Sequence, residues 1–199
     1  MDLTSISFWE QFHNRHGVMQ GEWYFSYAHV SQYIQSYLDE TNNQPRLALH
    51  CGSGEYPVQY LSSSSASPYV VLNFDYAASC LSKIGAPYEI AIADALRTPY
   101  RSHTFDIIIE KGLFDSVTST GSSSNAYHLL TEYSRLLSKV DGTIFIFSIF
   151  GPNAEKKDMM GLLCHEDLQV ECRSLYRTPA ELPDQDFCFL YIVRRQLVT

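Results

Sequence analysis

The segment Phe105-Asp-Ile-Ile-Ile-Glu-Lys-Gly-Leu-Phe-Asp115 decides the fold, because an apolar run ends there in charged residues and a glycine. Such a run is typical of a strand buried on both faces of a parallel sheet. Upstream, Leu47-Ala-Leu-His-Cys-Gly-Ser-Gly54 predicts a second strand that runs into a glycine turn. Ligands of open α/β sheets bind outside the carboxyl ends of the strands, so both segments point to one crevice. The pair predicts a nucleotide-type cofactor site.

Outward from this pair, expected strands alternate with helical stretches, which is the pattern of a doubly wound, mostly parallel α/β sheet. The last two strands are connected only by Arg177–Asp186, which is too short for a helical crossover. We therefore expect these two strands to be antiparallel. The seven expected strands are Arg46–His50, Tyr69–Phe74, Tyr88–Ile92, Phe105–Glu110, Gly142–Phe150, Leu168–Ser174 and Phe187–Arg194.

The segments between the strands indicate helices and loops. Apolar residues recur at helical spacing in Tyr127–Ser138, which predicts a helix that ends before Asp141-Gly142. Pro57 is expected in the first turn of the helix that follows the glycine turn. The serine-rich stretches Ser62–Ser67 and Ser119–Ser124 are expected to be surface loops. No repeat or linker divides the chain, so residues 1-199 are predicted to form a single domain.

The composition is that of a folded globular protein, with 45% hydrophobic and 18% charged residues. The 14 Lys and Arg against 22 Asp and Glu give a net charge of -8, which argues against nucleic acid as a partner. The five cysteines form no Cys-x-x-Cys pair, so we expect reduced thiols, a cytoplasmic location and no metal site. Neither a targeting segment nor a membrane span is predicted, and we expect no membrane partner.

The glycine turn His50-Cys-Gly-Ser-Gly54 lets the backbone approach a ligand closely. A dinucleotide fingerprint needs a third glycine at the helix start, and Glu55-Tyr-Pro57 stands there instead, which disfavours NAD and FAD. Asp75, about 20 residues after the turn, is placed to accept both ribose hydroxyls. Tyr76 is predicted to pack on adenine, and Asp94 to accept a hydrogen bond from the adenine amino group. Asp also favours helix caps and turns, but two at successive strand ends behind a glycine turn favour a site.

Three other constellations are weaker. His13-x-x-His16 has the spacing of metal ligands, but there is no evident third ligand and a surface helix is the favoured interpretation. Ser53 lacks the Gly-x-Ser-x-Gly spacing of a nucleophile elbow and is predicted to serve the turn. Glu110 and Asp115 are candidates for general acid–base chemistry, although the sequence does not show that they face each other.

Phe8-Trp-Glu-Gln-Phe12 and Glu22-Trp-Tyr-Phe-Ser-Tyr27 resemble the paired entry motifs of the seven-β-strand methyltransferases that modify lysines in other proteins. Glu110-Lys-Gly-Leu-Phe-Asp115 is similar to their Asp/Glu-Lys-Gly-Thr-x-Asp signature after the fourth strand. The likeness is to the elongation factor 1-alpha lysine methyltransferases and also to the citrate synthase lysine methyltransferase. It covers nearly the whole chain. The entry and Lys-Gly motifs are fairly specific to this family, whereas the glycine turn is shared across the fold.

The resemblance implies a Rossmann-like seven-stranded, mostly parallel sheet with an antiparallel last strand and helices on both faces. It also implies S-adenosyl-L-methionine as cofactor, a lysine of a protein as methyl acceptor, and residues 1-45 as a helical cap that closes the pocket. A monomer is favoured. The candidate proton acceptors are Glu110, Asp115 and Tyr24. The implied cofactor contacts are Trp9, Trp23, His50, Gly52, Asp75, Tyr76, Asp94, Ala95 and Lys111.

Two positions depart from the family pattern. His50 stands where glycine is usual, and Leu113 replaces a threonine and removes a hydroxyl beside the pocket. These departures favour an alternative, in which a non-catalytic methyltransferase-fold protein with a degenerate cofactor site binds a partner. A small-molecule methyltransferase on the same fold is a further alternative.

Overall fold

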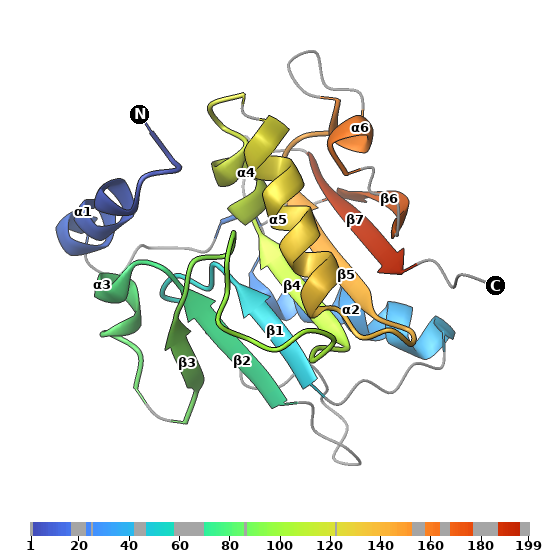
Figure 1. Cartoon of the computed structure of the whole chain (residues 1–199), viewed down its shortest axis with the longest axis horizontal. Helices are drawn as coiled ribbons and strands as arrows, with labels where there is room; N and C mark the ends of the chain where they lie inside the picture. Colours follow the sequence, from blue (N-terminus) through green and yellow to red (C-terminus); the bar gives the residue numbers. More distant parts are fainter. Residues whose placement is uncertain are drawn as a thin grey trace.

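The fold is a seven-stranded sheet in the order β3-β2-β1-β4-β5-β7-β6 (Figure 1). The computed structural model describes residues 2–16, 23, 24, 26–41, 47–57, 70–85, 87–121, 123–152, 158–163, 168–176 and 187–195. The strands are β1 (Leu47–Cys51), β2 (Val70–Asp75), β3 (Glu89–Ile92), β4 (Ile107–Lys111), β5 (Thr143–Ser148), β6 (Leu168–Tyr176) and β7 (Phe187–Arg195).

The predicted pairing of the strands is confirmed. The neighbours from β3 to β5 are all parallel, and β7 is antiparallel to both β5 and β6. All seven expected strands are present, with ends within two residues of the predicted ones. This order brings the end of β1 between the ends of β2 and β4, where the sequence predicts the crevice.

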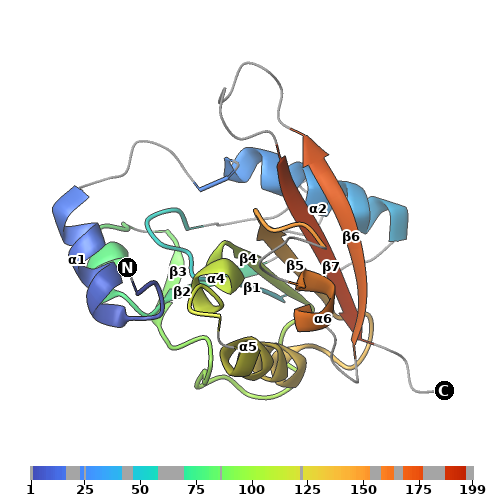
Figure 2. The same cartoon turned by 90° about the horizontal axis from the view of Figure 1, so that it is seen from above.

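Helices cover both faces of the sheet (Figure 2). One face carries α2 (Tyr27–Thr41), and the other carries α4 (Leu113–Val117), α5 (Ser123–Leu136) and α6 (Met159–Leu163). Along β4, Ile108 belongs to the apolar cluster beneath α5, whereas Ile107 and Ile109 belong to the cluster beneath α2. Both faces of the strand are buried, which explains its uninterrupted apolar run.

The helix predicted over Tyr127–Ser138 begins earlier than expected. It starts at Ser123, inside the serine-rich stretch that was expected to be a loop, and ends at Leu136. Ser119 and Gly121 are exposed residues outside this helix, so the loop prediction holds only for the first part of the stretch. Ala126 and Leu129 are buried against the sheet. This packing stabilises an earlier start of the helix, although Ser123 and Ser124 are weak helix formers.

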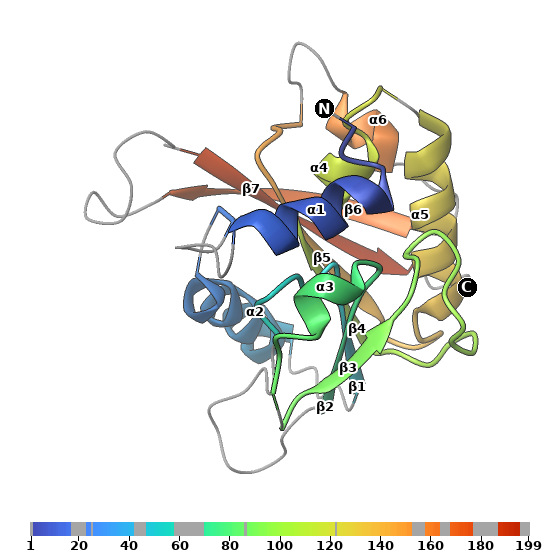
Figure 3. The ribbon, with the colours of Figure 1, turned by 90° about the vertical axis from the view of Figure 1, so that its left-hand side faces the viewer.

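The segment 1-45, expected as one cap, contains two helices in different places. α1 (Ile6–His16) lies beside α3 (Ala78–Leu81), the short helix that follows β2 (Figure 3). α2 instead buries Val30, Ile34 and Leu38 against the sheet. Of the described residues of this segment, those of α1, those just before it and Trp23 therefore lie where a cap over the strand ends is expected.

Several expectations fall outside the described residues. These are the helix expected after Pro57, the loop Ser62–Ser67, the connection Arg177–Asp186, and Glu22 and Phe25 of the entry motif. Within the described part of the chain, no helix has the length and apolar character needed to span a membrane.

Candidate functional site

A cavity of about 270 Å³ lies at the carboxyl ends of the parallel strands. Its size is just below the range of roughly 300 to 1,000 Å³ that is common for small-molecule sites. The structure brings together on its wall all of the predicted cofactor contacts: Trp9, Trp23, His50, Gly52, Asp75, Tyr76, Asp94, Ala95 and Lys111.

The residues of the glycine turn line this cavity. Gly52 has a φ of 63° and Gly54 a φ of 53°, in the left-handed region that glycine adopts without strain. A Cβ on Gly52 would lie 3.2 Å from Cβ of Leu113, so a side chain there would crowd the cavity. The Ser53 N–H donates to the carbonyl oxygen of Phe74 at 3.0 Å, which fixes the turn against β2.

Asp75 ends β2 beside this turn. Its Oδ2 accepts a hydrogen bond from the Gly54 N–H at 3.0 Å, and its Oδ1 accepts one from the Ala77 N–H at 2.9 Å. Burial raises the pKa of Asp75, and the backbone N–H groups oppose this by stabilising the charged form. The carboxylate is therefore fixed at the cavity wall, as binding of a ribose requires.

The adenine side of the predicted site is more open. Asp94 is exposed, and its Oδ1 accepts a hydrogen bond from the Leu96 N–H at 2.9 Å. The carboxylate thus makes the turn contact that Asp favours, and it lines the cavity as well. Tyr76 is partly buried, and burial together with the charge of Asp75 raises its pKa, so its hydroxyl stays protonated.

His50 occupies the position where the lysine methyltransferases that the sequence resembles have glycine, and the residue is 2% exposed. Its Nδ1 lies 3.0 Å from Oδ1 of Asn73, while Nδ2 of Asn73 donates to the carbonyl oxygen of Glu89 at 3.1 Å. Because that amide presents its oxygen to the ring, the histidine is assigned the tautomer with Nδ1 protonated. Burial lowers the pKa of His50 to about 4, so the ring is neutral at pH 7.

Two tryptophans line the outer part of the cavity. The ring centroids of Trp9 and Trp23 are 5.9 Å apart, and Trp23 remains 38% exposed. The indole N–H of Trp9 donates to the carbonyl oxygen of Leu3 at 2.8 Å. These are the only two tryptophans of the chain.

The three candidate proton acceptors do not line the cavity. The Tyr24 hydroxyl donates to Oδ2 of Asp115 at 2.7 Å, and Asp115 also accepts hydrogen bonds from the Ser148 hydroxyl and the Ile149 N–H. Burial and the charge of Asp115 raise the pKa of Tyr24. Tyr24 is therefore a hydrogen-bond donor, and Asp115 is already held by three donors.

Glu110 is the third candidate and is fully buried. Its Oε2 accepts a hydrogen bond from the Phe114 N–H at 2.7 Å, in the first turn of α4. Burial, and then the charge of Asp115, raise the pKa of Glu110 well above the ordinary value, so the environment favours the protonated form of the carboxyl group. Glu110 and Asp115 are close enough for their charges to interact, but neither residue lines the cavity.

Several polar residues of the cavity wall were not predicted as ligand contacts: Thr4, His13, Ser53, Glu55, Tyr56, Ser116 and Asn125. His13 was considered only as a metal ligand, and its Nδ1 lies 3.2 Å from Oε1 of Glu55 instead. No group of three metal-binding side chains occurs in the part of the chain that the structure describes. The position of Glu55 directly after the glycine turn was the one signal available in the sequence.

No family model matches the chain. A curated relative, the eEF1A lysine and N-terminal methyltransferase of Danio rerio, is 22% identical over 143 residues. The match covers 68% of this chain and 20% of the relative, so the chain spans about a fifth of that protein.

Solved structures give a likeness over almost the whole chain. N-methyltransferase NodS from Bradyrhizobium japonicum WM9, in complex with S-adenosyl-L-homocysteine, has a TM-score of 0.67 and 12% identity, covering 95% of this chain and 99% of that one. Magnesium protoporphyrin IX methyltransferase from Synechocystis PCC 6803, with bound SAM, has a TM-score of 0.64 and 13% identity, covering 96% and 97%. The chain therefore has the Rossmann-like fold of the S-adenosylmethionine-dependent methyltransferases.

Proposed function

We propose that this protein is an S-adenosylmethionine-dependent methyltransferase and that its methyl acceptor is a lysine side chain of another protein. The observation that carries the proposal is the single cavity that joins the glycine turn, Asp75, Asp94 and two tryptophans. The fold alone does not fix an activity, because unrelated functions share it. The chemistry of this wall supports one class of cofactor.

The residues present fit that cofactor. Gly52 provides a surface without a side chain, where a Cβ would fill the space, and Asp75 provides a fixed acceptor for ribose hydroxyls. Tyr76 and Asp94 provide a flat apolar ring and an acceptor for adenine. Lys111, at the end of β4, provides a positive charge for the carboxylate of the cofactor's methionine portion.

The cofactor, when bound, supplies a methyl group on a positively charged sulfur. The chain has to orient the acceptor amine and exclude water, and general acid–base groups contribute less than this positioning. Trp9 and Trp23 would face a cationic acceptor with their rings at the outer part of the cavity. A lysine has a pKa of about 10.4 in water, and an apolar entrance lowers that pKa by desolvation.

We assign Glu110, Asp115 and Tyr24 a positioning role. Glu110 holds the first turn of α4, and Asp115 ties α4 to Tyr24 and to the end of β5. These contacts fix the Gly112 turn and Trp23 at the edge of the cavity. We infer that the acceptor lysine gives its proton to solvent water as it enters the cavity, and not to one of these three groups.

The curated relative supports a protein substrate, because its name describes methylation of lysine and of an N-terminus in a protein. The net charge of -8 favours attraction of a basic segment of such a substrate. The described cysteines Cys51, Cys80, Cys172 and Cys188 are reduced thiols, which supports a reducing, cytoplasmic location.

To test the proposal, the purified protein is titrated with S-adenosylmethionine and with S-adenosylhomocysteine, and binding is measured by calorimetry and by tryptophan fluorescence. We expect micromolar binding and a change in emission, since both tryptophans line the cavity. Asp75→Ala should weaken binding by about tenfold or more, because a charged hydrogen-bond acceptor is lost. Glu89→Ala, an exposed acid of β3 away from the cavity, is the matched control. Absence of binding to either compound would overturn the proposal.

Transfer itself is tested with labelled S-adenosylmethionine and a mixture of basic protein substrates, followed by identification of the modified residue. We expect the label on lysine side chains, and less of it with Asp75→Ala. Label found exclusively on small molecules would leave the cofactor assignment in place and contradict the protein substrate.

A second candidate function is a non-catalytic protein that keeps the fold and binds a partner. The observation that favours it is the buried side chain of His50 at a position that serves close backbone approach. His50→Gly separates the two candidates. We expect the variant to bind S-adenosylhomocysteine less tightly, because His50 belongs to a working pocket. A large gain in affinity would instead indicate a decayed site.

A further inference from the structure

Glu55 is the first residue after the glycine turn, and its side chain is 5% exposed. Its Oε1 accepts a hydrogen bond from Nζ of Lys83 at 2.6 Å and lies 3.2 Å from Nδ1 of His13. Lys83 also donates to the main-chain carbonyl oxygen of His13 at 2.6 Å. The carboxylate is thus held by α1 on one side and by the residues after α3 on the other.

The second oxygen of the Glu55 carboxylate, Oε2, lacks such hydrogen-bond donors among the described residues. Glu55 is a residue of the cavity wall, and this oxygen is buried. Ser53, two residues earlier, also belongs to this wall, and its hydroxyl oxygen is likewise buried without a partner in the described part of the chain. Buried polar atoms in native proteins are nearly always satisfied, so two such atoms on one wall indicate groups that a ligand satisfies.

The position of Glu55 narrows the choice of ligand group. Gly54, which lies between Ser53 and Glu55, donates its N–H to Asp75, so the two carboxylates flank the same turn. Two carboxylates on this side of the wall repel anions, so the ligand group that binds here has to supply hydrogen-bond donors. Hydroxyl groups of a ribose are such donors, and the position of Asp75 places the ribose on this side of the cavity.

We propose that Glu55 Oε2 is a second acceptor for the ribose hydroxyls of the cofactor, beside Asp75. Lys83 and His13 hold Glu55 in position by occupying its other oxygen. Glu55 also joins the ligand to α1, because the same carboxylate contacts both. This inference rests on the proposed function.

The experiment compares S-adenosylhomocysteine with its 2′-deoxy and 3′-deoxy analogues in calorimetric titrations of the full chain. The variant is Glu55→Gln, which keeps the size of the side chain and an oxygen for Lys83, so the fold is preserved. Glu89→Gln makes the same chemical change at an exposed position outside the cavity and serves as control. The loss of affinity caused by Glu55→Gln is compared between S-adenosylhomocysteine and each deoxy analogue. A difference between these losses measures the interaction of Glu55 with the missing hydroxyl.

We expect Glu55→Gln to bind S-adenosylhomocysteine about tenfold less tightly than the natural chain, as for loss of a charged acceptor. One of the deoxy analogues should bind the two proteins almost equally, because it lacks the hydroxyl that Glu55 accepts. Equal affinity of both proteins for S-adenosylhomocysteine would overturn the inference and leave the proposed function intact. A tenfold loss that is the same for all three compounds would also overturn it. If the natural chain binds none of them, the proposed function fails first.

Discussion

Glu110 is an acidic residue in an interior environment. Glu110 is fully buried, its Oε1 has no hydrogen-bond partner among the described residues, and its pKa is raised by burial and by Asp115. In the unfolded chain the carboxyl group ionises above a pH of about 4.3. The folded chain holds the proton to a higher pH, so the unfolded state releases protons first and stability falls as pH rises.

Glu110→Gln removes this pH dependence and keeps an acceptor for the Phe114 N–H. We expect the variant to gain stability relative to the natural chain as pH increases from 5 to 8. Urea unfolding at several pH values measures the difference directly. A constant difference across this range would show that Glu110 ionises alike in both states.

His50 makes the stability of the fold fall as pH decreases, whereas Glu110 makes it fall as pH increases. Its pKa is lowered by burial to about 4, whereas an unfolded histidine titrates near pH 6.5. As pH falls below 6.5 the unfolded chain gains a proton first, which costs the folded state about 3 kcal/mol by pH 4. We expect His50→Gln, which retains a donor for Asn73, to lose less stability over this interval. The exposed His128→Gln is the matched control, and equal slopes in all three proteins would contradict the expectation.

Gly112 combines a left-handed backbone with a close neighbour. Its φ is 82°, and an added Cβ would lie 3.2 Å from the ring and from the hydroxyl of Tyr24. Gly121 has a φ of 77°, and no described atom lies within 4 Å of the place that an added Cβ would take. Both substitutions to Ala incur the strain of a positive φ, and only Gly112→Ala also displaces Tyr24 from Asp115.

We therefore expect Gly112→Ala to reduce the free energy of unfolding by about 2 kcal/mol or more, and Gly121→Ala by about 1 kcal/mol. Chemical denaturation of both variants gives the comparison. Equal losses would show that the ring of Tyr24 moves aside without cost.

At the scale of elements, the strands were the most predictable part. β4 and β5 are buried on both faces, so their apolar runs are uninterrupted and their positions follow from the sequence. The antiparallel arrangement of β6 and β7 followed from the length of the chain between them. The glycine turn, Asp75 and Asp94 were expected to meet, because the carboxyl ends of adjacent parallel strands lie at one edge, and these residues line one cavity. The resemblance alone suggested Trp9 and Trp23.

Features that depend on tertiary contacts were not predictable. The first turn of α5 contains Ser123 and Ser124, which favour a loop locally, and packing of Ala126 decides for a helix. The network of Glu55, Lys83 and His13 joins segments far apart in sequence, and no local pattern indicates it. The assignment of Glu110 and Asp115 to chemistry came from their residue types, whereas their environment is visible only in three dimensions.

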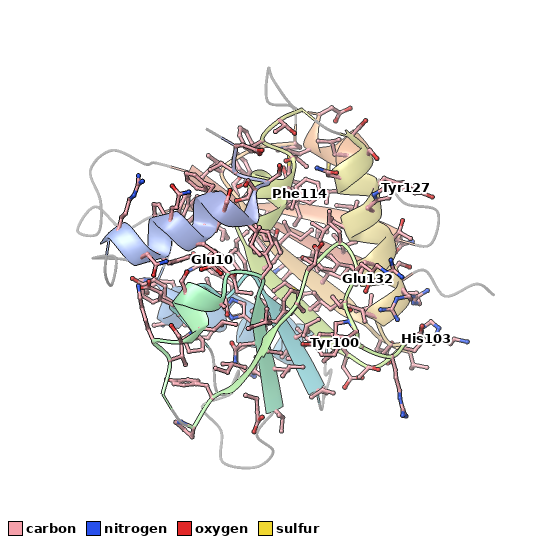
Figure 4. The ribbon with its side chains drawn as sticks, turned by 60° about the vertical axis from the view of Figure 1, so that its left-hand side comes forward. Glu10, Tyr100, His103, Phe114, Tyr127 and Glu132 are labelled. Carbon is pink, nitrogen blue, oxygen red and sulfur yellow. The ribbon has the colours of Figure 1, made fainter. Side chains whose placement is uncertain are left out.

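The side chain of Glu10 contributes two hydrogen bonds to the docking of α1 on α3. Glu10 extends from α1 toward α3, where its carboxylate accepts hydrogen bonds from the Ala78 N–H at 2.7 Å and the Ser79 N–H at 3.2 Å (Figure 4). A carboxylate at the start of a helix satisfies N–H groups that have no partner within the helix.

We expect Glu10→Ala to loosen α1, to reduce stability by about 1 kcal/mol and to weaken binding at the cavity, because Trp9 is the neighbouring residue. Hydrogen exchange of residues 6–16 and the emission of Trp9 report the loosening. Gln11→Ala, at an exposed position of the same helix, is the control. Unchanged exchange in Glu10→Ala would mean that apolar contacts hold α1.

At the scale of the whole molecule, the cavity wall is assembled from distant parts of the chain. α1, the turn after β1, the ends of β2 and β3 and the start of α4 all contribute to it. A ligand bound there contacts all these elements only in the folded state. Its binding free energy therefore adds to the stability of the entire fold, and not to that of one segment.

At a concentration of S-adenosylhomocysteine 100 times its Kd, this stabilisation is about 2.7 kcal/mol. In a domain of this size it corresponds to an increase in Tm of roughly 5 to 11 °C. We expect such an increase for the natural chain and a smaller one for Asp75→Ala at the same ligand concentration. NAD is the control ligand, because the glycine turn lacks the third glycine of a dinucleotide site. An equal increase with NAD would show that the cavity accepts any adenosine compound, and no increase with either would contradict a cofactor site at these strand ends.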